Sequence, residues 1–352
     1  MSLTSSVLAG DRLALARLLS QVENDSPEGR TTLAELFLST GKAHLIGVTG
    51  APGTGKSSLV NQLALHFRRQ DNKRVAIVAV DPSSPFTGGA VLGDRVRMRD
   101  LAGDSGVFIR SMASRGSLGG LAQTTASVVQ VFDAAGYDIV IIETVGAGQG
   151  EVDIARLAHT TIVVEAPGLG DDIQAIKAGI LEVADILVVN KADRPGVENT
   201  EKALRSMLEL AHPTQRVFKH HGVSMNVDVP KTTPSDKMIW FPPIHRTIAT
   251  EGIGIPDVAE SIAKHLAHLR QSGDWAARER ARLEVELEAL IQEALVSRFR
   301  AGVSQKRYDE VVESVIHRTL SPWEAVKMLL NSPHTIPSSI RRGNRGEGGK
   351  SK

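Results

Sequence analysis

A glycine-rich octapeptide constrains this chain more than any other feature of its sequence. It fits the pattern G-x-x-x-x-G-K followed by Ser or Thr, the phosphate-binding P-loop. Its residues are Gly50, Ala51, Pro52, Gly53, Thr54, Gly55, Lys56 and Ser57. An apolar run over 44–49 precedes it and a helical pattern over 58–69 follows, which is the strand–loop–helix setting that the motif needs. The glycines let successive N–H groups face a phosphate at the positive end of the following helix. We therefore predict a nucleotide site in which Ser58 also takes part, Lys56 reaches the β- and γ-phosphates and the Ser57 hydroxyl binds magnesium.

The bulk composition is that of an ordinary globular protein. The chain has 352 residues, of which 41% are hydrophobic and 23% charged, and its formal net charge is +1. That balance gives no indication of a nucleic acid or of a membrane surface as partner. The sequence shows no 18-residue apolar run and no secretory leader, so we expect a cytoplasmic location. The absence of cysteine excludes disulfides and thiolate metal sites.

Apolar strand-like runs alternate with helical patterns over 44–270. This rhythm predicts an α/β fold with a doubly wound, mostly parallel sheet, extended by helices at both ends of the chain. The expected strands after the P-loop are 74–80, 107–112, 137–142, 160–165 and 186–190, and a further helix is expected over 93–102. The expected organisation is a helical preface at 1–40, a P-loop domain at 41–272, a helical region at 273–337 and a disordered tail at 338–352. Residues 212–243, rich in proline and histidine, form an irregular insert in this scheme.

A second motif indicates which base is bound. Asn190, Lys191, Ala192 and Asp193 follow a buried strand and match the N-K-x-D pattern. The Asp193 carboxylate can accept hydrogen bonds from N1–H and the exocyclic amine of guanine, whereas adenine presents an acceptor where guanine has N1–H. The sequence therefore favours GTP over ATP. The loop from Thr247 to Gly252 lies where a fifth guanine-contacting loop is expected, with a backbone contact from Ala249.

A third motif follows the expected strand 137–142. Glu143, Thr144, Val145 and Gly146 stand where G proteins carry D-x-x-G. A carboxylate at the end of a strand suits magnesium, and the Gly146 N–H suits a γ-phosphate. Release of that contact after hydrolysis would make this loop a switch.

Five segments, taken together and in this order, resemble the MeaB/ArgK-type G proteins. They are residues 80–85, 93–98, 115–121, 143–149 and 190–193, and the similarity covers roughly 8–330. The resemblance implies a P-loop GTPase with GTP/GDP and Mg²⁺ as its ligands. It implies a chaperone of a cobalamin-dependent acyl-CoA mutase, methylmalonyl-CoA mutase or a relative. Such a chaperone gates cofactor loading and protects or reactivates the mutase, and the mutase in turn stimulates GTP hydrolysis by the chaperone. It also implies a homodimer with contacts in the C-terminal helices.

The resemblance also assigns roles to individual residues. Ser57, Asp81, Asp94 and Glu143 would surround the magnesium, a set of hard oxygen ligands that suits this cation. Residues 168–177 resemble the third switch of the family, in which Gln174 and Lys177 share one helix face. The implied catalytic residues are Lys56, Lys177, Gln174 and Asp81, with Lys177 arriving at the γ-phosphate as an arginine finger does.

Several alternatives stay open at this point. A nickel-inserting GTPase of related build and a transport-coupled or kinase-like ATPase of the ArgK branch are the other candidate functions. The insert at 212–243 is longer than the family leads us to expect, and Ile248 stands where the fifth loop usually has Ser. The stripe of Leu283, Leu287 and Leu290 fits either a subunit contact or packing on the chain's own core.

Overall fold

The computed structural model of the chain describes residues 2–81, 98–101, 103–113, 120–144, 154, 156–168, 183–211, 217–220, 223–226 and 239–330. They fall into two compact units, Met1–Glu286 and Leu287–Lys352. In the described part of the chain, no helix is both long and apolar enough to cross a membrane.

The first unit is built on a seven-stranded sheet with the order β3-β2-β4-β1-β5-β6-β9, and every pairing in it is parallel. The strands are β1 (His44–Thr49), β2 (Val75–Asp81), β3 (Val107–Ala113), β4 (Ile139–Thr144), β5 (Thr160–Glu165), β6 (Ile186–Asn190) and β9 (Ile244–Thr247). This confirms the predicted α/β fold with a doubly wound, parallel sheet. The short β-branched runs suit strands that are buried on both faces.

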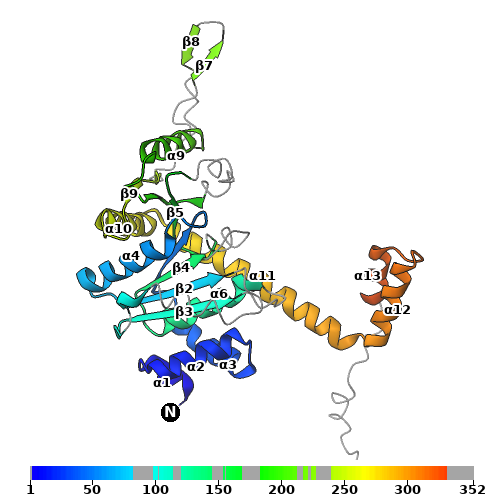
Figure 1. The fold of residues 1–352 in the computed structure, drawn as a ribbon. Helices are drawn as coiled ribbons and strands as arrows, with labels where there is room; N and C mark the ends of the chain where they lie inside the picture. Colours follow the sequence, from blue (N-terminus) through cyan, green and yellow to red (C-terminus); the bar gives the residue numbers. More distant parts are fainter. Residues whose placement is uncertain are drawn as a thin grey trace, which may run out of the picture. The chain divides into compact units, whose positions relative to one another are not determined.

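Helices cover both faces of this sheet (Figure 1). Successive strand residues point to opposite faces, so Leu45 packs in one core and Ile46 in the other. The face with Ile46 is covered by α4 (Lys56–Asp71) and α10 (Ile255–Ser272). The face with Leu45 is covered by α6 (Gly120–Ala134), and α9 (Val197–Ala211) packs on β5 and β6.

The N-terminal preface consists of α1 (Leu3–Leu8), α2 (Arg12–Glu23) and α3 (Pro27–Leu36), followed by the short 3-10 helix η1 (Phe37–Ser39). Asp11 and Ser26 cap α2 and α3 by accepting hydrogen bonds from backbone N–H groups of the first turn. The apolar residues of α2 join the core of α6, so the preface is a second layer over that helix.

The insert contains regular structure that the sequence did not predict. Within 212–243, β7 (Val217–His220) and β8 (Val223–Asn226) form an antiparallel pair. Two short runs that begin with β-branched residues, separated by His221 and Gly222, give a hairpin signal that the surrounding prolines obscured. Of the expected helix 93–102, the structure describes only the 3-10 turn η2 (Arg99–Leu101) and Met98 before it.

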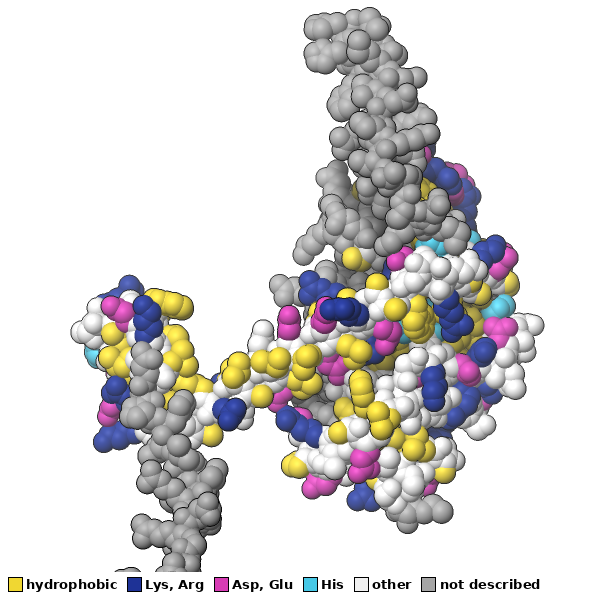
Figure 2. Space-filling model, turned by 180° about the vertical axis from the view of Figure 1, so that it is seen from behind, with side chains coloured by type: hydrophobic (Ala, Val, Ile, Leu, Met, Phe, Trp, Pro, Cys, Tyr) yellow, Lys and Arg dark blue, Asp and Glu magenta, His cyan; other side chains and the backbone are white. Residues whose placement is uncertain are grey.

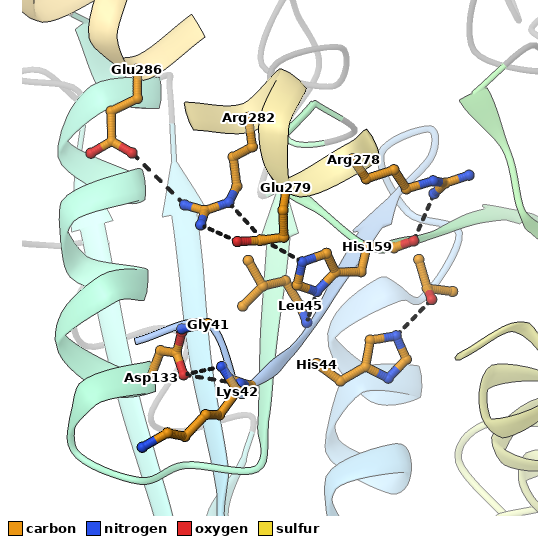
Figure 3. A network of polar contacts seen from close by, with 12 residues as sticks. Gly41, Lys42, His44, Leu45, Asp133, His159, Arg278, Glu279, Arg282 and Glu286 are labelled. Carbon is orange, nitrogen blue, oxygen red and sulfur yellow. Dashed lines mark hydrogen bonds and ion pairs between the residues drawn. The ribbon is translucent and has the colours of Figure 1, made fainter. Parts of the chain in front are cut away.

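A buried polar network fastens the first turns of α11 (Asp274–Gly302) to the end of the sheet opposite the P-loop (Figure 3). Arg278 binds both carboxylate oxygens of Asp185 at 2.7 and 2.8 Å and the His159 carbonyl at 2.6 Å. The Nε2 atom of His159 lies 2.6 Å from Glu279, and its Nδ1 accepts from Leu45 N–H. Because Nδ1 accepts, the proton of the neutral ring is on Nε2 and points to the carboxylate. Burial raises the pKa of Glu279, but the bonds from His159 and Arg282 outweigh it and lower this pKa to about 2.

The second unit continues α11 and adds α12 (Gln305–Ile316) and α13 (Pro322–Leu330). Ser304 caps α12, and Val311, Ala325 and Leu329 form a small core between the last two helices. Hydrophobic side chains run along α11 and over this helix pair (Figure 2). Leu287 is 57% and Leu290 44% exposed, so these members of the leucine stripe are only partly covered.

Candidate functional site

Four loops meet at the carboxyl edge of the sheet. The P-loop follows β1, Glu143 is the next-to-last residue of β4, Asn190 ends β6 and Thr247 ends β9. Ligands of open α/β sheets bind at this edge, outside the carboxyl ends of the strands. The structure thus brings together three motifs that are far apart in the sequence: the P-loop, the segment that begins at Glu143 and the guanine motif that begins at Asn190.

The P-loop backbone needs glycine at two positions. Gly50 has a φ of +138°, and a Cβ built there would lie 2.1 Å from the Val164 carbonyl oxygen of β5. Gly55 has a φ of +94°, and its Cβ would lie 2.3 Å from Asn190 Nδ2. Both side-chain positions are filled by fixed neighbours, so the loop turns into α4 only with glycine there.

Lys56 opens α4 and its side chain turns back over the loop. Its ammonium donates to the carbonyls of Gly50 at 2.7 Å and Ala51 at 3.1 Å, and only 6% of the residue is exposed. The cation is therefore held inside the curl of the P-loop, at the N-terminus of a 16-residue helix. A helix N-terminus and an ammonium both favour an anion.

Ser57 and Glu143 form the part of the site that suits a cation. The Ser57 hydroxyl donates to Glu143, with 2.5 Å between Oγ and Oε1. Glu143 is 1% exposed and pairs in register with Val48 of β1, so the strand places its carboxylate beside the P-loop helix. A hydroxyl and a carboxylate in contact are hard oxygen donors of the kind that Mg²⁺ prefers.

Asn190 connects three loops through one buried amide. Its Nδ2 donates to the Thr54 carbonyl at 2.8 Å, which ties it to the P-loop. Its Oδ1 accepts from Thr247 Oγ1 at 3.0 Å and from Ala249 N–H at 3.1 Å. All four residues are at most 2% exposed. The amide thus fixes the guanine motif, the P-loop and the loop after β9 relative to one another.

The other two motif residues differ in their surroundings. Lys191 has a φ of +57° and donates from Nζ to the Gly53 carbonyl at 2.6 Å, a second link to the P-loop. Asp193, two residues on, is exposed to solvent. The Asp193 carboxylate is open to solvent, and its backbone lies three residues after the buried and hydrogen-bonded Asn190. It is therefore placed to accept hydrogen bonds from a base.

The predicted fifth-loop contact has a competing bond. Ala249 is 2% exposed, and its N–H already donates to Asn190 Oδ1. A contact between this N–H and the base requires Asn190 to share or release it.

Several predicted site residues lie outside the described parts of the chain. These are Asp94, Gly146, Gln174 and Lys177. The Asp81 backbone ends β2, and β2 pairs with β4 through Ala79 and Glu143, so the two strands end at the same edge. Nothing is described of the Asp81 side chain.

Two residues that build the site were missed by the sequence reasoning. Thr247 supplies a hydroxyl to Asn190, and Val164 sets the close approach to Gly50. Thr247 had been named only as the first residue of the expected fifth loop, and the signal for its role was a hydroxyl at the end of a strand. The contact with Val164 has no sequence signal, because it depends on which strand lies beside β1.

Comparison with known proteins agrees with this geometry. The family profile described as "Methylmalonyl Co-A mutase-associated GTPase MeaB" matches residues 15–304. The chain belongs to the MeaB family. The P-loop, Glu143 and the guanine motif of this MeaB-family chain all lie inside the matched range.

Relatives of this MeaB-family chain match it over most of their length. It is 35% identical over 327 residues to the Escherichia coli protein named "GTPase ArgK", covering 91% of this chain and 92% of that one. It is 30% identical over 346 residues to the mouse "Methylmalonic aciduria type A homolog, mitochondrial", covering 94% and 78%. A solved structure titled as a LAO/AO transport system kinase is similar with a TM-score of 0.65 and 27% identity, covering 93% and 95%.

Proposed function

We propose that this MeaB-family protein binds and hydrolyses GTP as the chaperone of a cobalamin-dependent acyl-CoA mutase, gating cofactor loading and protecting or reactivating the mutase. The observation that carries the nucleotide part is the 2.8 Å bond from Asn190 Nδ2 to the Thr54 carbonyl, which joins the guanine motif to the phosphate loop. The mutase part is supported by membership of a family described as mutase-associated.

The described residues suggest how the phosphates are held. Lys56 now bonds two neutral carbonyls of the P-loop. Phosphate oxygens are stronger, charged acceptors, so we expect the ammonium to exchange those carbonyls for the β- and γ-phosphates. The N–H groups of the loop and the N-terminus of α4 add to the same field. In the proposal, the backbone from Gly50 to Ser58 binds the phosphates while Asp193 accepts from the base.

Ser57 and Glu143 are the residues that we propose to hold Mg²⁺, together with Asp81 and Asp94. When bound, Mg²⁺ would neutralise charge on the β- and γ-phosphates. The hydrogen bond between Ser57 and Glu143 keeps the two oxygens in contact, so that this half of the ligand set is assembled by the fold. Gly146, two residues after the end of the same strand in the sequence, is proposed to contact the γ-phosphate.

Stimulation of GTP hydrolysis by a partner requires a catalytic group that reaches the nucleotide only in the complex. We propose Lys177 for this role, with Gln174 on the same face of the third switch. A cation that reaches the γ-phosphate only in the complex would act as an arginine finger, an effect of about 10³–10⁵ in rate. The resemblance to the third switch supports this proposal.

We also propose a homodimer whose contact is an apolar groove in the second unit. The groove has a volume of about 530 Å³. Its lining includes Phe299, Tyr308, Val312, Ile316 and Leu330, with no charged side chain among its lining residues. Tyr308 is 44% and Ile316 62% exposed. Contiguous exposed apolar surface of this kind marks a protein contact, and a second copy of the chain is the occupant that the family resemblance supports. A cytoplasmic location stays a prediction of the sequence.

A kinase-like or transport-coupled ATPase is the second candidate. The name of the similar solved structure, a transport system kinase, favours it. The N-K-x-D motif and its link to the P-loop oppose it, since Asp193 suits guanine and not adenine. The metal-insertion alternative has less support, because the matched family is described by a mutase and not by a metal.

Two measurements test the proposal. Isothermal titration calorimetry with GTP, GDP and ATP should give binding of the guanine nucleotides with ATP weaker by at least about 10²-fold. Equal affinity for ATP would favour the kinase-like candidate. Size-exclusion chromatography with purified methylmalonyl-CoA mutase should give a co-eluting complex in the presence of a guanine nucleotide. Absence of a complex with this mutase and with its relatives would remove the chaperone role and leave the GTPase intact.

A further inference from the structure

Thr54 is a fully buried residue in the middle of the P-loop. Its exposed fraction is 0%, although Pro52 and Gly53, directly before it, are exposed. The P-loop pattern accepts any residue at this position, so the motif itself does not call for a threonine. A buried hydroxyl costs free energy unless it has a hydrogen-bond partner. The partner of this hydroxyl therefore indicates what the side chain does.

The Thr54 hydroxyl closes a turn within the loop. Its Oγ1 donates to the Ala51 carbonyl at 2.9 Å, and the Thr54 N–H donates to the same oxygen at 3.3 Å. Between these two residues stand Pro52 and Gly53, and Gly53 has a φ of +80°. Proline at the second position of a turn and a glycine with positive φ at the third are typical of a type II turn. The turn over 51–54 is thus closed by a side-chain bond in addition to its backbone bond.

The carbonyl of Thr54 is bound to a different part of the site. It accepts from Asn190 Nδ2 at 2.8 Å, and Gly55, the N-cap of α4, follows directly. One residue therefore holds the turn of the P-loop with its hydroxyl and N–H, and the guanine motif with its carbonyl. Within the described residues, all of these bonds are formed without a nucleotide.

The Ala51 carbonyl is shared with the cation of the site. The Lys56 ammonium donates to it at 3.1 Å, so that the two donors of Thr54 and the ammonium converge on one oxygen. In the proposed nucleotide complex, Lys56 turns to the phosphates. The Ala51 carbonyl then keeps both donors of Thr54, and the turn stays closed while the ammonium changes partners.

We infer that Thr54 is a positioning residue of the nucleotide site, whose hydroxyl holds the turn over 51–54 in its phosphate-binding shape before the nucleotide arrives. This inference rests on the proposed binding of GTP and deepens it. A loop that is ordered beforehand loses less conformational freedom on binding, which increases affinity. The hydroxyl is bound to the loop itself, so its loss should change nucleotide affinity and leave the chemical step unchanged.

Two substitutions at Thr54 separate the hydroxyl from the shape of the side chain. Thr54→Val keeps the branched shape and removes the hydroxyl. It should weaken GDP binding, measured by calorimetry on the full-length protein, about 3–10-fold. The KM for GTP should rise by the same factor with kcat unchanged, because the lost bond acts on binding in the ground state and in the transition state alike. Thr54→Ser keeps the hydroxyl and should bind GDP as the wild type does.

Thr32→Val is the matched control. Thr32 is 8% exposed, and its hydroxyl donates to the Glu28 carbonyl at 2.8 Å within α3 of the N-terminal preface. The substitution therefore removes a buried bond of the same kind at a position outside the P-loop. Thr32→Val should bind GDP with wild-type affinity.

A measurement on the wild type needs no variant. In the unliganded protein, the N–H groups of Thr54 and Gly55 should give NMR order parameters near the rigid-backbone value of about 0.85, and values below about 0.6 would overturn the inference. So would wild-type GDP affinity in Thr54→Val, or equal weakening in Thr54→Ser or Thr32→Val. A wild type that binds no guanine nucleotide would instead refute the proposed function, so the two failures are distinguishable.

Discussion

The Ser57 hydroxyl donates to the Glu143 carboxylate across 86 residues of sequence, with 2.5 Å between Oγ and Oε1. This contact joins the first turn of the P-loop helix to the end of the neighbouring strand, and both oxygens are of the kind that Mg²⁺ takes. It is the geometric basis for the proposed metal half of the site.

Glu143→Gln should lower Mg²⁺-supported GTP hydrolysis about 10–100-fold, because the amide keeps the shape of the side chain and loses its charge. The measurement is turnover as a function of Mg²⁺ concentration, with EDTA as the metal-free reference. The exposed carboxylate of Glu209 in α9 gives the control, since Glu209→Gln should keep wild-type turnover. Unchanged Mg²⁺ dependence in Glu143→Gln would remove this residue from the metal site.

Asn190→Ala should destabilise the fold by about 2–4 kcal/mol. The substitution removes three hydrogen bonds and leaves the Thr54 carbonyl, the Thr247 hydroxyl and the Ala249 N–H buried without their partner. Urea unfolding measures the change. The matched variant is Asp193→Asn, which alters an exposed side chain of the same motif and should stay within about 0.5 kcal/mol of the wild type.

The same matched variant tests base recognition. Asp193→Asn should lose GTP affinity and gain xanthosine triphosphate, whose C2 carbonyl can accept from the new amide. Calorimetry with both nucleotides gives the answer, and its interpretation is clean because the variant is expected to remain folded. Wild-type affinity for GTP in this variant would take the N-K-x-D segment out of the base site.

Arg278→Gln should cost about 3 kcal/mol of folding stability. The substitution removes the bidentate ion pair with Asp185, whose side chain is 8% exposed, and leaves that carboxylate buried without its guanidinium partner. Arg280→Gln, two residues along α11, removes an ion pair whose arginine is 80% exposed and should cost less than about 0.5 kcal/mol. Chemical unfolding of the two variants compares them directly, and equal costs would show that the network does not hold α11 in place.

Acid should destabilise the protein through its buried histidines. Burial, followed by the neighbouring His159, lowers the pKa of His44 to about 3, while the unfolded chain titrates near 6.5. The unfolded state therefore binds more protons below pH 6.5, and stability falls as the pH falls. For His44 alone the loss reaches about 4 kcal/mol near pH 3.

The slope of the unfolding free energy against pH between pH 6.5 and 5 tests this effect, and the difference between variants separates the contribution of His44 from those of other groups. His44→Gln should reduce the slope of unfolding free energy against pH by about 1.4 kcal/mol per unit, the contribution of one proton. His66→Gln, which alters a partly exposed ring of α4, is the control. A slope unaffected by His44→Gln would mean that this ring is protonated in the folded state.

Local patterns predicted most of the fold, and long-range contacts supplied the rest. The strands 160–165 and 186–190 were predicted to the residue, because apolar runs of this length are typical of buried parallel strands. The observed starts of two elements differ from the predicted ones because the end of a helix lies at the boundary. The helix after the P-loop begins at Lys56 because Gly55 is its N-cap, and β4 begins at Ile139 because Tyr137 N–H closes α6 on the Phe132 carbonyl.

The motifs predicted the chemistry of the site, but they did not predict the long-range hydrogen bonds that hold its parts together. The P-loop and the guanine motif each have a local signature. The bond from Asn190 to Thr54 spans 136 residues and that from Arg278 to Asp185 spans 93, and no periodicity encodes either one. Such pairs depend on strand order and on helix placement, which only the folded chain defines.

The central claim is that this MeaB-family GTPase works on a mutase, and GTP turnover with and without the partner tests it most directly. The rate of phosphate release is measured for the wild type and for Lys177→Ala, each alone and with saturating methylmalonyl-CoA mutase or a relative that forms a complex. We predict slow hydrolysis by the protein alone, a rate higher by about 10³-fold or more with the mutase, and loss of most of that increase in Lys177→Ala. The same wild-type rate with and without a mutase that is bound would contradict the account.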